Sequence, residues 1–233
     1  MNTPSTLKRS IAGLLCAAGV FAIAAPTASA QPAKIDTART KCLAAIDRRV
    51  TALNTAAAKI SGDKHLTEAH KSALSELVAT TTAGMNTQKA AVTAATDAAT
   101  LRPACEAIAT DYRVFAVVIP KIHLVRAVDG LDMARTRMTN VSSKLDAGLT
   151  KAEAAGKDTA AARASASAFT DAIGAIDTSG LADKILAVTP ADYNANKAVL
   201  DSLRSTVRTE VSDAKTARDL GKKAVTDAKA LRN

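Results

Sequence analysis

Apolar residues recur along most of this 233-residue chain at alternating spacings of four and three. This is the spacing of one face of a packed helix. The stripes are separated by glycine, proline and capping residues, and they predict helices over about 37–60, 67–96, 101–155, 159–187 and 190–231. Pro120 falls inside the third stripe and is expected to kink that helix without ending it. The β-branched stretch from Val114 to Ile119 is strand-like in composition, but the four-three period continues through it.

The pattern predicts an all-α fold: an elongated antiparallel helical bundle made of coiled-coil-like hairpins. Residues 31–233 are long enough for a single helical domain with its own core. Alanine and threonine occupy many surface positions, so the helices can pack closely while each buries little apolar area. The clearest stripe runs from Leu101 to Ile119, and we expect Phe115, at its centre, to be buried.

Cys42 and Cys105 are the only cysteines after residue 30, and we predict that they form one disulfide. Two free buried thiols are the alternative. A disulfide holds two Cα atoms within about 7 Å of each other. An unbroken helix over 67–100 would be roughly 50 Å long, against roughly 30 Å from Cys42 to the first turn, and would overshoot. We therefore expect the second helix to end early, near Thr96.

The first 30 residues have the three parts of a secretory signal peptide. Lys8 and Arg9 are basic, residues 11–25 are apolar or small, and Ala28-Ser29-Ala30 is a small-x-small cleavage sequence. The apolar run is shorter than the roughly 20 residues that a membrane-spanning helix needs. We predict cleavage after Ala30, a secreted or cell-envelope location, and no transmembrane segment in the mature chain.

The chain is basic, with 31 Lys and Arg against 22 Asp and Glu. Removal of Lys8 and Arg9 with the signal lowers the formal charge from +9 to +7. Outside a cell, this charge favours an anionic cell-envelope polymer or another envelope protein as partner. The aromatic content of 2%, with no Trp, argues against a stacking surface for nucleic acid.

Catalytic motifs are absent from the sequence, which has no H-E-x-x-H, G-x-S-x-G or P-loop. His65, Glu68 and His70 are close together, but two histidines five apart do not share a helix face. We therefore predict no enzyme activity, no catalytic residues, no metal and no cofactor.

The most distinctive stretch is residues 111–129, DYRVFAVVIPKIHLVRAVD. The favoured interpretation is a central core helix, because branched and aromatic residues at helical spacing usually pack. The alternative is a ligand-binding groove opened by the Pro120 kink. Its candidate lining residues are Tyr112, Phe115, Ile119, Lys121 and His123.

This stretch, the Cys42–Cys105 pair and the segment TPADYNANKAVL (residues 189–200) resemble uncharacterised exported helical proteins of bacteria. The resemblance covers most of the mature chain. It implies an exported helical protein, but no activity and no functional residues.

The C-terminal helix is the other candidate surface, because basic residues exceed acidic ones along it. The candidates for contact with an anionic polymer are Arg218, Lys222, Lys223, Lys229 and Arg232. Two functions follow from the sequence. The first is a non-enzymatic interaction or structural protein that binds anionic envelope polymers, and the alternative is a small-ligand or metal carrier that uses the region from Tyr112 to His123.

Overall fold

The computed structural model describes the backbone of residues 30–231 and the side chains of residues 33–231. Most of the described chain is helical and none of it forms a strand, which confirms the predicted all-α bundle. Its elements are α1 (Ala30–Gly62), α2 (Glu68–Ala94), α3 (Ala98–Thr110), the π-helix η1 (Val114–Val118), α4 (Ile119–Ala154), α5 (Ala160–Gly174), α6 (Leu181–Ala187), α7 (Pro190–Ala195) and α8 (Val199–Ala230). The predicted signal peptide and Arg232 lie outside the described side chains.

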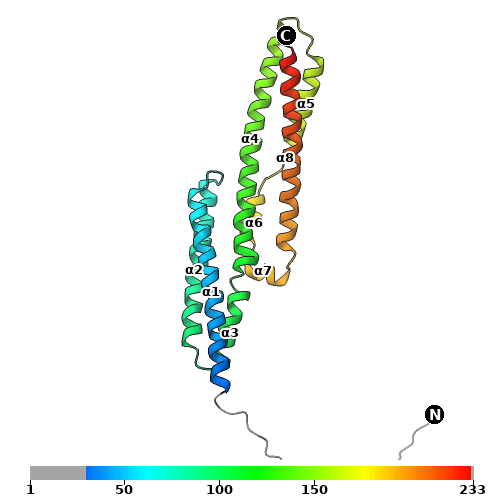
Figure 1. Ribbon diagram of the computed structural model, residues 1–233. Helices are drawn as coiled ribbons and strands as arrows, with labels where there is room; N and C mark the ends of the chain where they lie inside the picture. Colours follow the sequence, from blue (N-terminus) through cyan, green and yellow to red (C-terminus); the bar gives the residue numbers. More distant parts are fainter. Residues whose placement is uncertain (1–29, 232–233) are drawn as a thin grey trace, which may run out of the picture.

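The molecule is elongated and consists of two helical bundles (Figure 1). The bundles are offset along the long axis and lie beside each other over part of their length. Helices α1, α2 and α3 form the lower bundle, and α4, α5 and α8 form the upper one. The short helices α6 and α7 lie where the bundles meet. Helix α4 starts beside the lower bundle and continues to the far tip, so it connects the two.

Most buried apolar side chains belong to one core that fills the lower bundle and the junction. Its largest fully buried members include Ile46, Leu53, Leu74 and Met85. A second, smaller core in the upper bundle consists of Phe169, Ile173, Ile176, Ala217 and Ala224. Helix α8 approaches closely there because Gly221 has no side chain: an added Cβ would lie 2.7 Å from the Phe169 ring.

The predicted disulfide between Cys42 and Cys105 is present, with the two Cα atoms 5.7 Å apart. It joins α1 to α3. The expected early end of the second helix is also confirmed, since α2 ends at Ala94. Asp97 then caps α3 through a capping box with Thr100, which turns the chain back toward Cys42.

The predicted single helix over 101–155 is wrong: the chain breaks at residues 111–113, before Pro120. Arg113 has a φ of +42°, in the left-handed region that ends a helix. Its side chain donates to Asn194 Oδ1 at 2.7 Å, and Asn194 Nδ2 donates to the Thr110 carbonyl at 2.9 Å. The break is therefore stabilised by contacts from α7, about 80 residues further along the chain.

Pro120 lies in the first turn of α4, where a missing N–H is tolerated. The wider π-turn of η1 leads into it, with the Ile119 N–H bonded to the Val114 carbonyl. Two other predicted helices are also interrupted. The stretch 159–187 is divided into α5 and α6, and 190–231 into α7 and α8, while α1 begins earlier than predicted.

Candidate functional site

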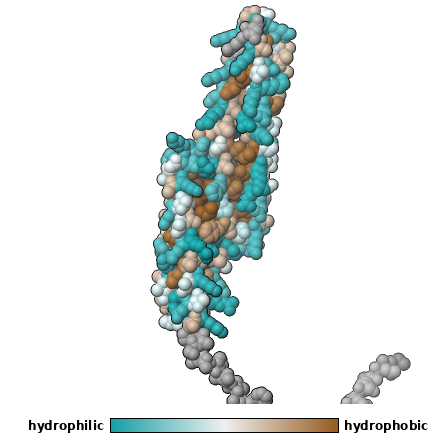
Figure 2. Space-filling view, viewed as in Figure 1, coloured by the Kyte–Doolittle hydropathy of each residue, from teal (hydrophilic) through white to brown (hydrophobic). Residues whose placement is uncertain are grey.

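A groove of about 800 Å³ lies between α1 and the start of α4. We call it the α1–α4 groove. Its walls are one face of α1, the loop 62–66, and side chains between Phe115 and Arg126. The α1 face consists of Ala52, Thr55, Ala56, Ala58, Lys59 and Ile60. The volume is within the range of sites that hold small molecules. Figure 2 shows hydrophobic surface around this level of the molecule, where the bundles meet, with hydrophilic side chains beside it.

The groove exists because α1 packs mainly against α2 and touches α4 only slightly. Alanines at positions 52 and 56 of α1 face the groove, and their small side chains leave the space open. Ile119 and Ile122 face it from α4. The result is a mainly apolar lining between two helices that run in the same direction (Figure 1).

Two contacts mark the ends of the groove. At one end the Arg49 guanidinium lies over the Phe115 ring, 5.4 Å from its centroid. At the other end Arg126 forms an ion pair with Asp63 in the α1–α2 loop. About ten residues of helix separate these ends, which corresponds to roughly 15 Å. The groove is therefore elongated.

The two ends differ in polarity. Ala52, Phe115 and Ile119 make the first end apolar, and the Phe115 side chain is 52% exposed. The loop end carries Lys59 and Lys64, which are exposed and have no ion-pair partner within the described residues. Among the lining residues, unpaired positive charge is therefore concentrated at the loop end, while the Arg49 guanidinium at the opposite end lies over the Phe115 ring.

Asp63 does not neutralise Lys59 and Lys64, because it already forms an ion pair with Arg126. Burial alone would raise the pKa of Asp63, but hydrogen bonds from the His65 backbone N–H and from Arg126, together with the Arg126 charge, lower that pKa overall. Asp63 is thus ionised at neutral pH and balances Arg126. The charges of Lys59 and Lys64 remain in excess.

The five predicted lining residues do not form one site. Phe115, Ile119 and His123 line the groove. Tyr112 instead packs on α2 at Gly84, where an added Cβ would lie 2.2 Å from its ring. Lys121 is 4% exposed and donates to the Leu186 and Val188 carbonyls at 2.7 and 2.8 Å. Burial lowers the pKa of Lys121, while the Asp192 charge opposes this effect.

The expectation that Phe115 is buried is wrong, and His123, which the core interpretation would also bury, is exposed. The break at residues 111–113 and the π-turn rotate this segment relative to a continuous helix. Val114, Val117 and Val118 therefore occupy the core, and Phe115 turns toward the groove.

His70 and Asp129 have a structural role outside the groove. Asp129 is buried and accepts hydrogen bonds from the Thr67 backbone N–H and from His70 Nδ1, at 2.8 and 2.7 Å. It thereby fixes the start of α2 against α4. Among the described residues, no group of three His, Cys, Asp or Glu side chains could hold a metal ion.

The predicted basic surface on α8 is partly neutralised. Lys223 pairs with Asp227 at 2.6 Å, and Lys222 pairs with Asp219 at 3.1 Å, with Arg218 3.7 Å from the same carboxylate. Lys229 is exposed. Seven basic and five acidic residues give α8 a net charge of only +2 over its 32 residues.

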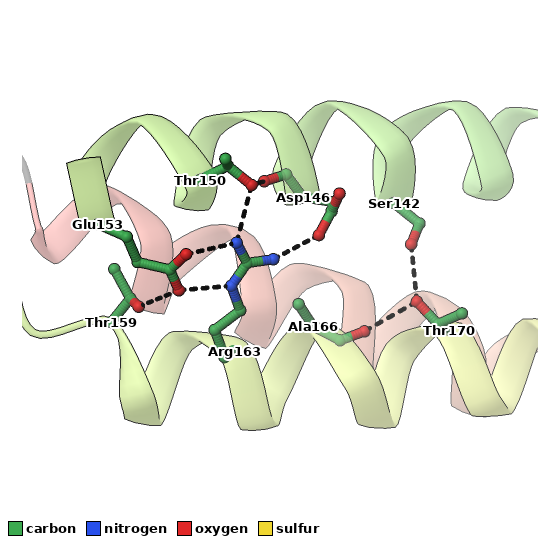
Figure 3. Close-up of polar contacts among 8 residues, drawn as sticks. All are labelled: Ser142, Asp146, Thr150, Glu153, Thr159, Arg163, Ala166 and Thr170. Carbon is green, nitrogen blue, oxygen red and sulfur yellow. Dashed lines mark hydrogen bonds and ion pairs between the residues drawn. The ribbon is translucent and has the colours of Figure 1, made fainter.

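A polar cluster at the far tip joins α4 to α5 around Arg163 (Figure 3). Its guanidinium donates to both carboxylate oxygens of Glu153, at 2.8 and 2.9 Å, and also contacts Asp146 and Thr150. Thr159 Oγ1 donates to Glu153 at 2.6 Å. These contacts join α4 to α5, so the cluster is a structural clamp between the two helices.

Comparisons with known proteins do not assign a function. No family model, curated protein sequence or solved structure matches this chain. No helix in residues 30–231 is long and apolar enough to cross a membrane.

The α1 side of the groove was not predicted from the sequence. Ala52, Ala56 and Lys59 follow a helical spacing, and this signal was available. It does not reveal which helix lies opposite, because that depends on the break at residues 111–113.

Proposed function

We propose that this chain is the precursor of an exported, non-enzymatic ligand-binding protein, and that the α1–α4 groove is its binding site. The observation that carries the proposal is the half-exposed Phe115 in an apolar channel of about 800 Å³. An exposed aromatic ring in a concave apolar surface is typical of ligand sites. The disulfide is compatible with an oxidising compartment outside the cytoplasm.

A secretory signal peptide is removed during export, and the predicted cleavage site follows Ala30. The intact mass of the protein recovered outside the cytoplasm should therefore correspond to Gln31–Asn233 with one disulfide. A dominant species that still contains residues 1–30 would contradict the predicted localisation.

The ligand-binding proposal is tested by native mass spectrometry of protein purified from its own host. This measurement needs no assumption about the ligand. We expect a species heavier than the polypeptide by the mass of a small molecule, which is lost under denaturing conditions. Polypeptide mass alone, at low collision energy and without added detergent, would contradict the proposal.

Binding of an anionic envelope polymer is the second candidate function. It is supported by exposed Lys229, and by Arg208 and Lys215, which have no ion-pair partner within the described part of α8. Such binding would be electrostatic, so retention on heparin resin should fall steeply between low and high salt. Retention that does not change with salt would exclude this mechanism.

A further inference from the structure

The two ends of the α1–α4 groove suit different parts of one ligand. The end at Phe115 and Ile119 offers apolar surface, and the loop end offers the ammonium groups of Lys59 and Lys64. Apolar surface favours a hydrocarbon, whereas unpaired ammonium groups favour an anion. The ends are roughly 15 Å apart by helical rise, so the ligand that satisfies both is long and has a charged end.

We infer that the groove binds a single-chain amphiphile with a carboxylate head group. The head lies at Lys59 and Lys64, and the hydrocarbon chain runs past Ile119 toward Phe115. This inference rests on the proposed function, because it names the ligand class of the same groove.

The charge balance of the lining sets the sign of the head group. Lys59, Lys64 and Arg126 are opposed only by Asp63 among the lining residues, which leaves two positive charges. Asp63 is already paired with Arg126. A bound carboxylate lowers the excess charge and meets donors that have no other ion-pair partner in the described chain.

The shape of the groove favours one chain over two. The groove lies between two neighbouring helices, and at one end the Arg49 guanidinium lies over the Phe115 ring. Ala52 and Ala56 are part of the α1 wall, so a larger side chain there would fill the path of the hydrocarbon.

The lysines also have a structural role that the test must separate from binding. Lys59 lies in the last turn of α1, where a positive charge complements the helix dipole. A loss of stability after mutation therefore does not demonstrate a ligand. Binding is demonstrated instead by the affinity for probes that differ only in the head group.

The experiment is calorimetric titration of the processed, disulfide-bonded protein, freed of ligand, with laurate, dodecanol and dodecylammonium below their micelle concentrations. We expect saturable binding of one laurate and at least about tenfold weaker binding of the other two, because the head-group contact is charge-assisted. The double variant Lys59→Gln/Lys64→Gln should weaken laurate binding about tenfold or more. The matched control Lys157→Gln, in the exposed α4–α5 turn, should leave it unchanged.

The outcomes separate the two proposals. Equal affinity for all three head groups, or an unchanged laurate affinity in the double variant, would overturn the carboxylate inference and leave a groove that binds apolar ligands. A retained native ligand without a carboxylate would also overturn the carboxylate inference. Absence of a retained ligand in native mass spectrometry would overturn the proposed function itself, whatever the head-group comparison gives.

Discussion

Phe115 and Phe169 both lie on helical stripes, but they differ in burial: the first is 52% exposed and the second 1%. Phe169→Ala should therefore lower the free energy of unfolding by about 3–5 kcal/mol, because it leaves a cavity in the small upper core. Phe115→Ala should change it by less than about 1 kcal/mol, because the ring is already half in solvent. Urea unfolding followed by circular dichroism measures both. Similar losses for the two variants would contradict the exposed position of Phe115.

Gly84 is required by the Tyr112 ring, which would lie 2.2 Å from an added Cβ. Gly84→Ala should therefore destabilise the protein by about 1–3 kcal/mol through overpacking, although alanine favours helix. The matched control is Gly148→Ala in α4, where no atom lies within 4 Å of the added Cβ. It should stabilise by about 0.5–1 kcal/mol. If both variants stabilise, Tyr112 does not pack on α2 as described.

At this scale, the sequence predicts which side chains are apolar but not which way each one turns. Phe115 belongs to a regular stripe, and its exposure results from a change in backbone winding just before it. Lys121 can be buried because its ammonium group donates hydrogen bonds to two carbonyls at the end of α6. Neither partner is close in sequence.

Some helix boundaries are determined by neighbouring residues in the sequence, and others by contacts with distant segments. The starts of α2 and α3 are set locally by the capping residues Thr67, Asp97 and Thr100, and such residues can be recognised in the sequence. The break at residues 111–113 depends on Tyr193 and Asn194 from α7, with the Arg113 guanidinium 5.5 Å from the Tyr193 ring centroid. A local sequence pattern contains no information about this contact. The sequence therefore predicts an irregularity at Pro120 and none at residues 111–113.

The tip of the α4–α5 hairpin should respond to acid at an unusually low pH. Hydrogen bonds from Arg163, and then from Thr159, lower the pKa of Glu153 from its ordinary 4.5 to about 2. Because the folded pKa is below the unfolded one, the contact stabilises the hairpin above about pH 4.5 and loses this effect as the pH falls toward 2. NMR titration of the Glu153 carboxyl carbon measures the midpoint directly.

Arg163→Gln provides the comparison for this titration. It should return the Glu153 midpoint to the ordinary glutamate range, since the main cause of the shift is removed. A midpoint near 4.5 in the unmutated protein would show that the clamp in Figure 3 does not persist in solution.

For the whole molecule, the disulfide closes a loop of 63 residues between α1 and α3. Its reduction should cost about 2–5 kcal/mol, because the unfolded chain regains conformational freedom. The melting temperature should fall by several degrees while the helix signal at low temperature is largely kept. Differential scanning calorimetry with and without reductant checks this, and an unchanged melting temperature would contradict a stabilising role for the disulfide.

The bundle architecture could be predicted because helical periodicity and the reach between two cysteines limit the possible topologies. The groove could not, because it arises where α1 and α4 diverge, and that divergence depends on the position of the chain break. Phe115, Ile119 and His123 could be predicted as groove residues from the sequence, but the α1 residues opposite them could not.

The central claim is that the α1–α4 groove holds a ligand, and native mass spectrometry of two groove variants tests it most directly. Ala52→Leu places a larger side chain in the groove, whereas Ala57→Leu makes the same change at an exposed position of α1 outside it. We predict that protein purified from its own host retains a small molecule in the unmutated and Ala57→Leu forms and loses it in Ala52→Leu. Equal retention by all three forms, or retention by none, would contradict the claim.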